Sequence, residues 1–157
     1  MNKLITFFFL TILGGIITYF GYLFIYKINI SDSQIKVLIN QKEYLLNIAK
    51  TDEERSRGLA KFDTIKENEG MLFIFDVPGR YSFYMKGMKF NIDIIFLDQN
   101  KIVVDLYKNV KFQDYKNPYD YETYKPNFNS KYTIELKEGE IEKNGVKLGD
   151  YIDFSIK

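Results

Sequence analysis

Four side chains in this sequence could carry acid–base or anion-binding chemistry. Two are carboxylates, Asp93 and Glu135, and each lies within a run of apolar residues that predicts a strand. Two are cations, Arg57 and Lys86, and each precedes a glycine that indicates a turn. A desolvated carboxylate can act as a general acid or base, and a nearby cation can stabilise an anion. We therefore take these four as candidate site residues.

Asp93 lies one residue inside the predicted strand Ile92 to Asp98 and shares its face with Ile95 and Leu97. One interpretation is a desolvated acid or a ligand contact with a raised pKa. The alternative is a structural role, in which the carboxylate caps the preceding turn by accepting backbone N–H groups of residues 89–91. Asp98 lies about 16 Å further along the strand, too far for a glycosidase pair at roughly 5 to 10 Å.

Lys86 follows the predicted strand Tyr81 to Met85 and shares a face with Ser82 and Tyr84. That face offers hydroxyls and an amine to a ligand. An exposed strand edge followed by a tight turn explains the same residues without a ligand.

Glu135 lies between Ile134 and Leu136 in the predicted strand Tyr132 to Leu136. The period of two turns its side chain away from both neighbours. Glu135 therefore either faces solvent or joins Lys86 and Asp93 in a cleft.

Tyrosines form a further group of candidates in the irregular segment 108–131, where Tyr119, Tyr121 and Tyr124 alternate with acidic residues. Ring faces stack on the apolar faces of sugars, and carboxylates accept hydrogen bonds from sugar hydroxyls. This composition indicates a carbohydrate or polar-polymer surface. Alternatively, the rings cover the open end of a β-sandwich.

The chain contains no cysteine and no histidine. Catalytic triads, cysteine nucleophiles, zinc fingers and histidine-ligated metals are therefore excluded, and we expect no metal and no cofactor. The methionines Met71, Met85 and Met88 are interpreted as core residues. The 22 Lys and Arg residues include Lys3 and Lys27, so residues 28–157 hold about 20 cations against 21 acids. This near balance of charges does not indicate the basic surface that nucleic-acid binding requires.

The sequence from Leu4 to Tyr26 contains no charged residue and would span roughly 34 Å as a helix, enough for a bilayer core of about 30 Å. Residues 1–27 are therefore predicted to be a transmembrane signal anchor, residues 28–33 a linker, and residues 34–157 a single domain. The short N-terminal tail favours an extracytoplasmic position for that domain, although the charges flanking the span are nearly balanced.

About eight short strands are predicted between residues 34 and 157, with a first hairpin formed by residues 34–39 and 43–48. Thr51 and Glu54 form a capping box, which predicts a short helix that ends at Gly58. The pattern indicates a mainly β fold, an antiparallel β-sandwich or jelly-roll-like barrel with one or two short helices. A closing strand is predicted over residues 151–156.

Several segments together resemble the family known as domain of unknown function 192. Its members typically read Arg-Gly-Leu-Met, Gly-Met-Leu-Phe-x-Phe, Phe-Trp-Met-Lys-Asn-Thr, Pro-Leu-Asp and Tyr-Val-Leu-Glu-Leu. The corresponding residues here begin at Arg57, Gly70, Phe83, Asn91 and Tyr132. The resemblance implies a jelly-roll-like β fold without a settled activity. Ala60, Tyr84 and Gly87 depart from the family pattern, which would alter any contacts that the family makes there.

We expect a membrane-anchored, non-catalytic binding module for an envelope polymer or a small polar ligand. An alternative is a metal-independent hydrolase or lyase, in which Asp93 or Glu135 is the general acid or base and Lys86 or Arg57 stabilises an anion. A third is a membrane scaffold that contacts other proteins through its anchor and an edge strand.

Overall fold

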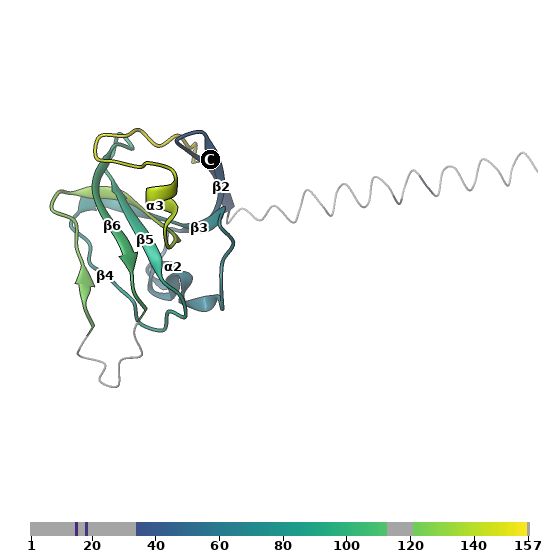
Figure 1. Cartoon of the computed structure of the whole chain (residues 1–157), viewed down its shortest axis with the longest axis horizontal. Helices are drawn as coiled ribbons and strands as arrows, with labels where there is room; N and C mark the ends of the chain where they lie inside the picture. Colours follow the sequence, from purple (N-terminus) through teal and green to yellow (C-terminus); the bar gives the residue numbers. More distant parts are fainter. Residues whose placement is uncertain (1–14, 16–17, 19–33, 113–120, 157) are drawn as a thin grey trace, which may run out of the picture. The chain divides into compact units, whose positions relative to one another are not determined.

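The computed structural model describes residues 15 and 18 and the ranges 34–112 and 121–156. Gln34–Lys157 form one compact unit, built mainly of β-strands (Figure 1). In spatial order, the strands of its larger sheet are β1 (Gln34–Ile39), β2 (Lys42–Ala49), β3 (Glu69–Gly79), β8 (Ser130–Lys137), β5 (Ile92–Leu97) and β6 (Val103–Val110). A smaller sheet and short helices complete the described part: β4 (Phe83–Tyr84), β7 (Thr123–Tyr124), α2 (Asp52–Arg57), the 3-10 helix η1 (Gly58–Lys61) and α3 (Glu140–Lys143). The prediction of a mainly β fold with short helices is confirmed.

The first hairpin and the first helix form as the sequence predicts. Strands β1 and β2 pair antiparallel through the turn at residues 40–41. At the start of α2, the Thr51 hydroxyl accepts from the Glu54 N–H, and the Glu54 carboxylate accepts from the Thr51 N–H. These reciprocal bonds satisfy backbone donors that have no partner within the helix.

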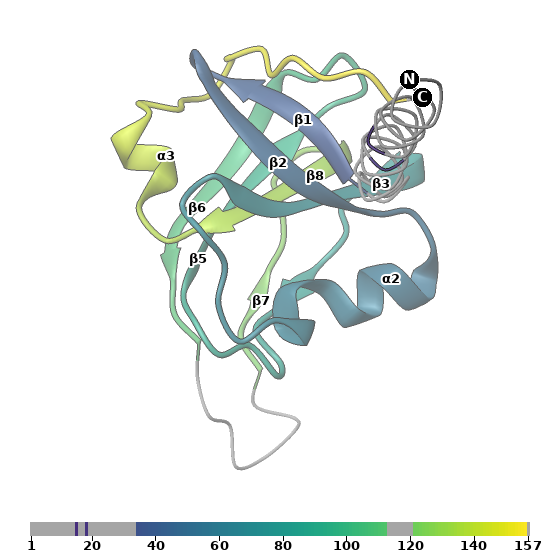
Figure 2. The ribbon, with the colours of Figure 1, turned by 90° about the vertical axis from the view of Figure 1, so that its right-hand side faces the viewer.

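The pairing of β2 with β3 contradicts the prediction of an antiparallel fold. These strands run parallel, with Leu45 opposite Glu69 and Ala49 opposite Phe73. Parallel neighbours need a crossover connection. Here α2 and η1 supply it, as Figure 2 shows by the path from β2 through α2 and back to β3. The larger sheet is therefore mixed.

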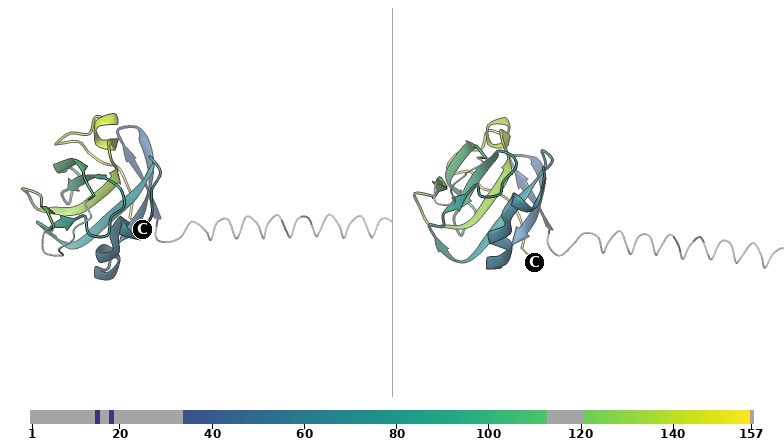
Figure 3. Two further views of the ribbon diagram at one scale, coloured as in Figure 1. Left: turned by 60° about the horizontal axis from the view of Figure 1, so that its bottom comes forward. Right: turned by 90° about the horizontal axis from the view of Figure 1, so that it is seen from below.

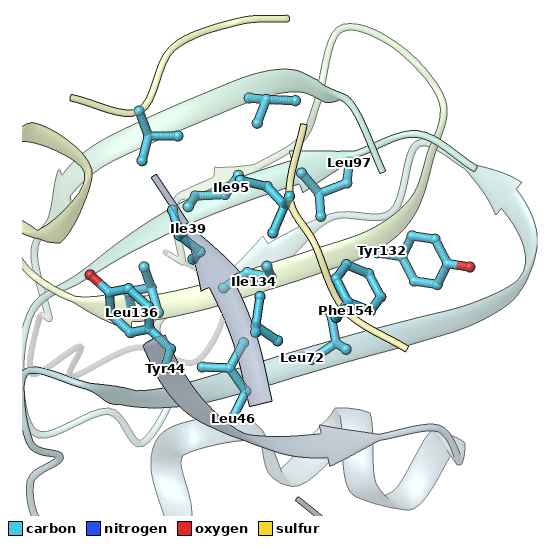
Figure 4. Close-up of a cluster of buried hydrophobic side chains, with 14 of the residues drawn as sticks. Ile39, Tyr44, Leu46, Leu72, Ile95, Leu97, Tyr132, Ile134, Leu136 and Phe154 are labelled. Atoms are coloured by element: carbon cyan, nitrogen blue, oxygen red, sulfur yellow. The ribbon is translucent and has the colours of Figure 1, made fainter. Parts of the chain in front are cut away.

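The larger sheet buries apolar side chains on both faces, because alternate residues of β8 and β5 point to opposite sides. The first cluster (Figure 4) consists of Ile35, Val37, Ile39, Tyr44, Leu46, Leu72, Ile95, Leu97, Val103, Tyr132, Ile134, Leu136, Ile141, Val146, Ile152 and Phe154. It takes side chains from all six strands, so the sheet curls around it (Figure 3). The second cluster, on the other face, consists of Ala49, Leu59, Ile65, Met71, Phe73, Phe75, Met85, Ile92, Ile94, Phe96, Val110 and Tyr124.

The predicted closing strand over residues 151–156 is reduced to two isolated bridges. Asp153 pairs with Leu38 of β1, and Tyr151 pairs with Ile102, just before β6. The C-terminal segment thus spans the gap between the two edge strands of the larger sheet. The described strands form a curled, open, mixed sheet rather than the expected antiparallel sandwich or jelly-roll-like barrel.

Two other predicted strands have different bounds. The sequence predicts a strand over residues 71–75 and, from its Pro-Gly pair, a turn at residues 77–80. In the structure, β3 instead continues as far as Gly79, with a register shift against β8 between Ile74 and Gly79. The predicted strand over residues 81–85 shortens to β4. A bulge of this kind bends a strand without ending it, so a Pro-Gly pair at the bulge was mistaken for a turn.

The predicted transmembrane anchor, Leu4 to Tyr26, lies outside the described residues except for Gly15 and Thr18. Within the part of the chain that the structure describes, no helix has the length and apolar character needed to cross a membrane.

Candidate functional site

A pocket of about 240 Å³ lies on the side of the sheet that carries the second cluster. Its walls come from the crossover between β2 and β3, from β3, and from the segment around β4. Five lining residues are aromatic: Phe73, Phe75, Tyr81, Phe83 and Tyr84. Four are charged: Arg55, Arg57, Lys86 and Glu135. The others are Ser56, Gly58, Leu59, Ala60, Ser82 and Met88. We call this cavity the Glu135 pocket.

The turn at Gly58 shapes the wall formed by the crossover. Gly58 has φ +48°, a conformation that side chains disfavour, and its N–H donates to the Glu54 carbonyl at the end of α2. The turn leaves Arg57 exposed and directs Leu59 into the second cluster, where it is 1% exposed. The local sequence therefore leaves the cation Arg57 at the surface and buries the apolar Leu59 two residues later.

Glu135 is the buried polar residue of the pocket. It lies on β8 opposite Met71 of β3 and Ile94 of β5, in the middle of the larger sheet. The residue is 7% exposed. Within the ranges 34–112 and 121–156, no side-chain hydrogen bond or ion pair engages its carboxyl. Burial raises the pKa of this carboxyl from 4.5 to about 8, so the protonated form predominates at neutral pH.

Packed aromatic rings form much of the wall. The ring centroids of Phe73 and Phe83 lie 5.1 Å apart in an edge-to-face arrangement, and Phe75 stacks on Tyr81 at 3.8 Å. The Arg55 guanidinium lies 5.2 Å from the centroid of the Phe75 ring. Such contacts hold each ring in place, so the wall is largely preformed.

The three cations of the pocket differ in how far they are already engaged. Arg55 pairs with Asp52 and donates to the Ile74 carbonyl at 2.9 Å, which fixes it as a structural residue. Arg57 pairs with Glu53 on the exposed surface of α2. Lys86 is exposed and forms no ion pair with any residue that the structure describes. Lys86 is therefore the cation most available to a ligand.

Asp93 lies on the opposite face of the sheet from Glu135. In the pairing of β5 with β8, Asp93 is opposite Leu136 and Ile94 is opposite Glu135. Because neighbouring residues of a strand point to opposite faces, the carboxyl groups of Asp93 and Glu135 lie on different faces of the sheet. Asp93 is fully buried and accepts hydrogen bonds at 2.8 Å from the backbone N–H groups of Asn109 and Ile141. The predicted capping role is thus correct in kind but wrong in its partners. Of the two alternatives for Glu135, a cleft shared with both Lys86 and Asp93 does not form, because Asp93 lies on the other face of the sheet.

The candidate tyrosines are also divided. Tyr84 lines the pocket, and its ring centroid lies 6.1 Å from that of Tyr121. Tyr124 is 8% exposed, belongs to the second cluster, and packs edge-to-face against Tyr107 at 5.4 Å. Tyr119 lies outside the described residues. The structure therefore brings together Arg57, Tyr84, Lys86 and Glu135 in one pocket, with Tyr121 nearby.

Several lining residues were missed because their sequence signal indicated only a core. Phe73, Phe75 and Phe83 are spaced as the apolar face of two strands, and they are part of or packed against the second cluster. They also line the pocket. Arg55 could have been found only from the parallel pairing of β2 with β3, which sets α2 beside β3. No group of three Asp, Glu, His or Cys side chains within the described ranges is arranged to hold a metal ion.

Comparison with known proteins agrees with the fold and with the motifs. The family model of DUF192, described as Uncharacterized ACR, matches residues 35–154. A UPF0127 protein of Thermococcus sibiricus is 32% identical over 114 residues, which cover 71% of this chain and 67% of the relative.

Two solved structures share the fold. A proposed transcription regulator from Sinorhizobium meliloti has a TM-score of 0.66 at 18% identity, covering 77% of this chain and 92% of that protein. A protein of unknown function from Novosphingobium aromaticivorans has a TM-score of 0.64 at 23% identity, covering 76% of this chain and 83% of that protein. The family match spans most of the compact unit and includes every segment that lines the Glu135 pocket. The chain therefore belongs to the DUF192 family.

Proposed function

We propose that the chain is a non-catalytic binding module that holds a small organic molecule in the Glu135 pocket. The observation that carries this proposal is the Glu135 carboxyl itself, which is buried in the pocket wall without a partner among the described residues. Because Glu135 lines the cavity, a ligand there can supply the hydrogen bond that no described residue makes. Binding sites commonly combine apolar walls with a few polar groups in this way.

The size of the pocket favours a small ligand over an envelope polymer. Drug-sized ligands occupy pockets of about 300 to 1,000 Å³. The Glu135 pocket, at about 240 Å³, lies just below that range. A polymer would need an open groove, and Tyr124, one of the residues expected to form such a surface, is buried in the second cluster.

A membrane anchor completes the proposal. The uncharged sequence from Leu4 to Tyr26 supports attachment to a membrane, with the compact unit on the extracytoplasmic side. A reporter that is active only outside the cytoplasm, fused after Lys157, should be active. A stable but inactive fusion would contradict this orientation.

Binding is tested by screening small metabolites against the purified full chain and measuring its melting temperature. A ligand at one hundred times its Kd should stabilise the protein by about 2.7 kcal/mol. Replacing Ala60, which lines the pocket, by leucine should abolish the shift because the larger side chain enters the cavity. The matched control is Lys61→Leu, an exposed neighbour outside the pocket. A shift that persists in A60L would refute binding in this pocket.

A second function, acid–base catalysis by Glu135, is favoured by one observation. Burial in the pocket wall raises the pKa of its carboxyl to about 8, close to the value at which a group can both donate and accept a proton at neutral pH. Asp93 cannot assist because it lies on the other face of the sheet. If a bound metabolite is consumed by the wild type but only bound by E135Q, the protein is an enzyme. Binding without turnover in both would support the binding module.

A further inference from the structure

The polar lining residues of the Glu135 pocket differ in exposure: one is a buried carboxyl and two are exposed cations. This difference restricts the chemical class of the ligand. The inner polar group, Glu135, is 7% exposed. At the solvent side lie Arg57 and Lys86, both exposed. Five aromatic side chains also line the pocket. Resting on the proposed binding function, we infer that the ligand is a compact organic acid whose anionic group lies at Lys86 and Arg57 and whose far oxygen accepts a hydrogen bond from Glu135.

The charge of the lining favours an anion over an amine. Three of the four charged lining residues are cations. The nearby acids Asp52 and Glu53 already pair with Arg55 and Arg57. Lys86 has no such acid among the described residues, so its charge is left for a ligand. A protonated amine would have to enter past these cations and would also require the desolvated Glu135 to ionise.

The inner end of the pocket selects a hydrogen-bond acceptor. A protonated carboxyl has one O–H donor. Since Glu135 has no partner among the residues of the described ranges, this donor remains available to a ligand. A hydroxyl, ether or carbonyl oxygen can accept it, whereas an aliphatic end would leave it unsatisfied. A second carboxylate at this position would face the buried Glu135 carboxyl and would be costly to desolvate.

The volume and the walls define the body of the ligand. A cavity of about 240 Å³ is smaller than the pockets of about 300 to 1,000 Å³ that drug-sized ligands occupy, which restricts the ligand to a small molecule. The walls formed by Phe73, Phe83 and Tyr81 suit a planar or unsaturated body. The expected class is therefore a small aryl or unsaturated monocarboxylate with an oxygen substituent far from its acid group.

Three probes of nearly equal size test the assignment: 4-hydroxybenzoate, 4-hydroxybenzamide and 4-hydroxybenzylamine. They differ in the group opposite the hydroxyl, which is an anionic carboxylate, a neutral amide or a cationic amine, respectively. Affinities for the purified full chain are measured at pH 7 by NMR titration. We expect 4-hydroxybenzoate to bind at least tenfold more tightly than the amide, and the amine to bind most weakly.

Two lysine variants locate the anionic end. Lys86→Gln should reduce the affinity for 4-hydroxybenzoate towards that of the amide and leave the affinity for the amide unchanged. The matched control is Lys89→Gln, because Lys89 is also exposed but pairs with Asp63 and does not line the pocket. Equal losses in the two variants would refute a specific role for Lys86.

The remaining outcomes separate this inference from the proposed function. Equal or tighter binding of the amide or the amine would overturn the assignment of an organic acid while leaving a binding module in place. Failure of 4-hydroxybenzoate to bind would also overturn it. The binding function itself would fall if the metabolite screen gave no shift in the wild type, or a shift that persists in A60L.

Discussion

Replacing Glu135 by glutamine should make the stability of the protein less sensitive to pH. Glutamine has nearly the same shape but cannot ionise. In the folded wild type, burial raises the pKa of the Glu135 carboxyl from 4.5 to about 8. Below about pH 4.5 the carboxyl is protonated in both folded and unfolded chains. Between that pH and about 8, the unfolded chain ionises while the folded chain stays protonated, so this group lowers the free energy of unfolding as pH rises.

The expected magnitude follows from the width of this pH window. Each pH unit within it changes the free energy of unfolding by about 1.4 kcal/mol, so the full effect is on the order of 5 kcal/mol. Between pH 5.5 and pH 8, the E135Q variant should gain about 3 kcal/mol relative to the wild type. The other ionisable lining residues, Arg55, Arg57, Lys86, Tyr81 and Tyr84, are the same in the wild type and in E135Q, so the comparison isolates Glu135.

Urea denaturation of the full chain between pH 5 and pH 9 measures this effect. The control variant is Glu142→Gln, which changes an exposed glutamate of α3 and should follow the wild type at every pH. Other carboxylates with lowered pKa values affect all three proteins alike and cancel in the comparison. If the wild type and E135Q give parallel curves, the Glu135 carboxyl is not desolvated and the argument for an unpaired acid in the pocket is wrong.

Four further predictions concern the stability of the fold. Gly70→Ala should lower the free energy of unfolding by at least about 2 kcal/mol in urea denaturation, because a Cβ there would lie 2.2 Å from the Glu135 carbonyl oxygen. Gly149→Ala, at a glycine with φ +88° and open space around it, should cost only about 1 kcal/mol. Asp93→Ala should destabilise the protein by about 2 to 4 kcal/mol, since the buried N–H of Ile141 and the part-buried N–H of Asn109 lose their acceptor, yet leave probe affinity in the Glu135 pocket unchanged. Thr51→Ala should cost about 1 kcal/mol in thermal unfolding through loss of the α2 cap, and a neutral result would show that the capping box does not stabilise the fold.

Features set by neighbouring residues could be predicted from the sequence. The capping box of Thr51 and Glu54, the helix stop at Gly58 and the first hairpin each depend on residues a few positions apart. The alternation in β8 likewise correctly turned Glu135 away from Ile134. These signals operate within a single turn or strand, where the chain has few conformational choices.

Features set by contacts between distant segments could not be predicted. The partners of Asp93 are Asn109 and Ile141, which a search for a local cap cannot find. The alternation of β8 likewise could not tell whether Glu135 meets solvent or protein, because the covering layer comes from the crossover and from β4. That layer depends on the parallel pairing of β2 with β3, for which an isolated strand gives no sign.

The two bridges made by the C-terminal segment have a consequence for synthesis of the chain. Leu38 can complete its pairing only with Asp153, and Ile152 and Phe154 fill the first cluster. A nascent chain that has not yet supplied residues 151–154 therefore exposes both an unpaired sheet edge and an open core. Such surfaces are recognised by chaperones and promote aggregation. Completion of the domain is thus coupled to the emergence of its last segment, and a chain truncated at residue 150 should be selectively degraded.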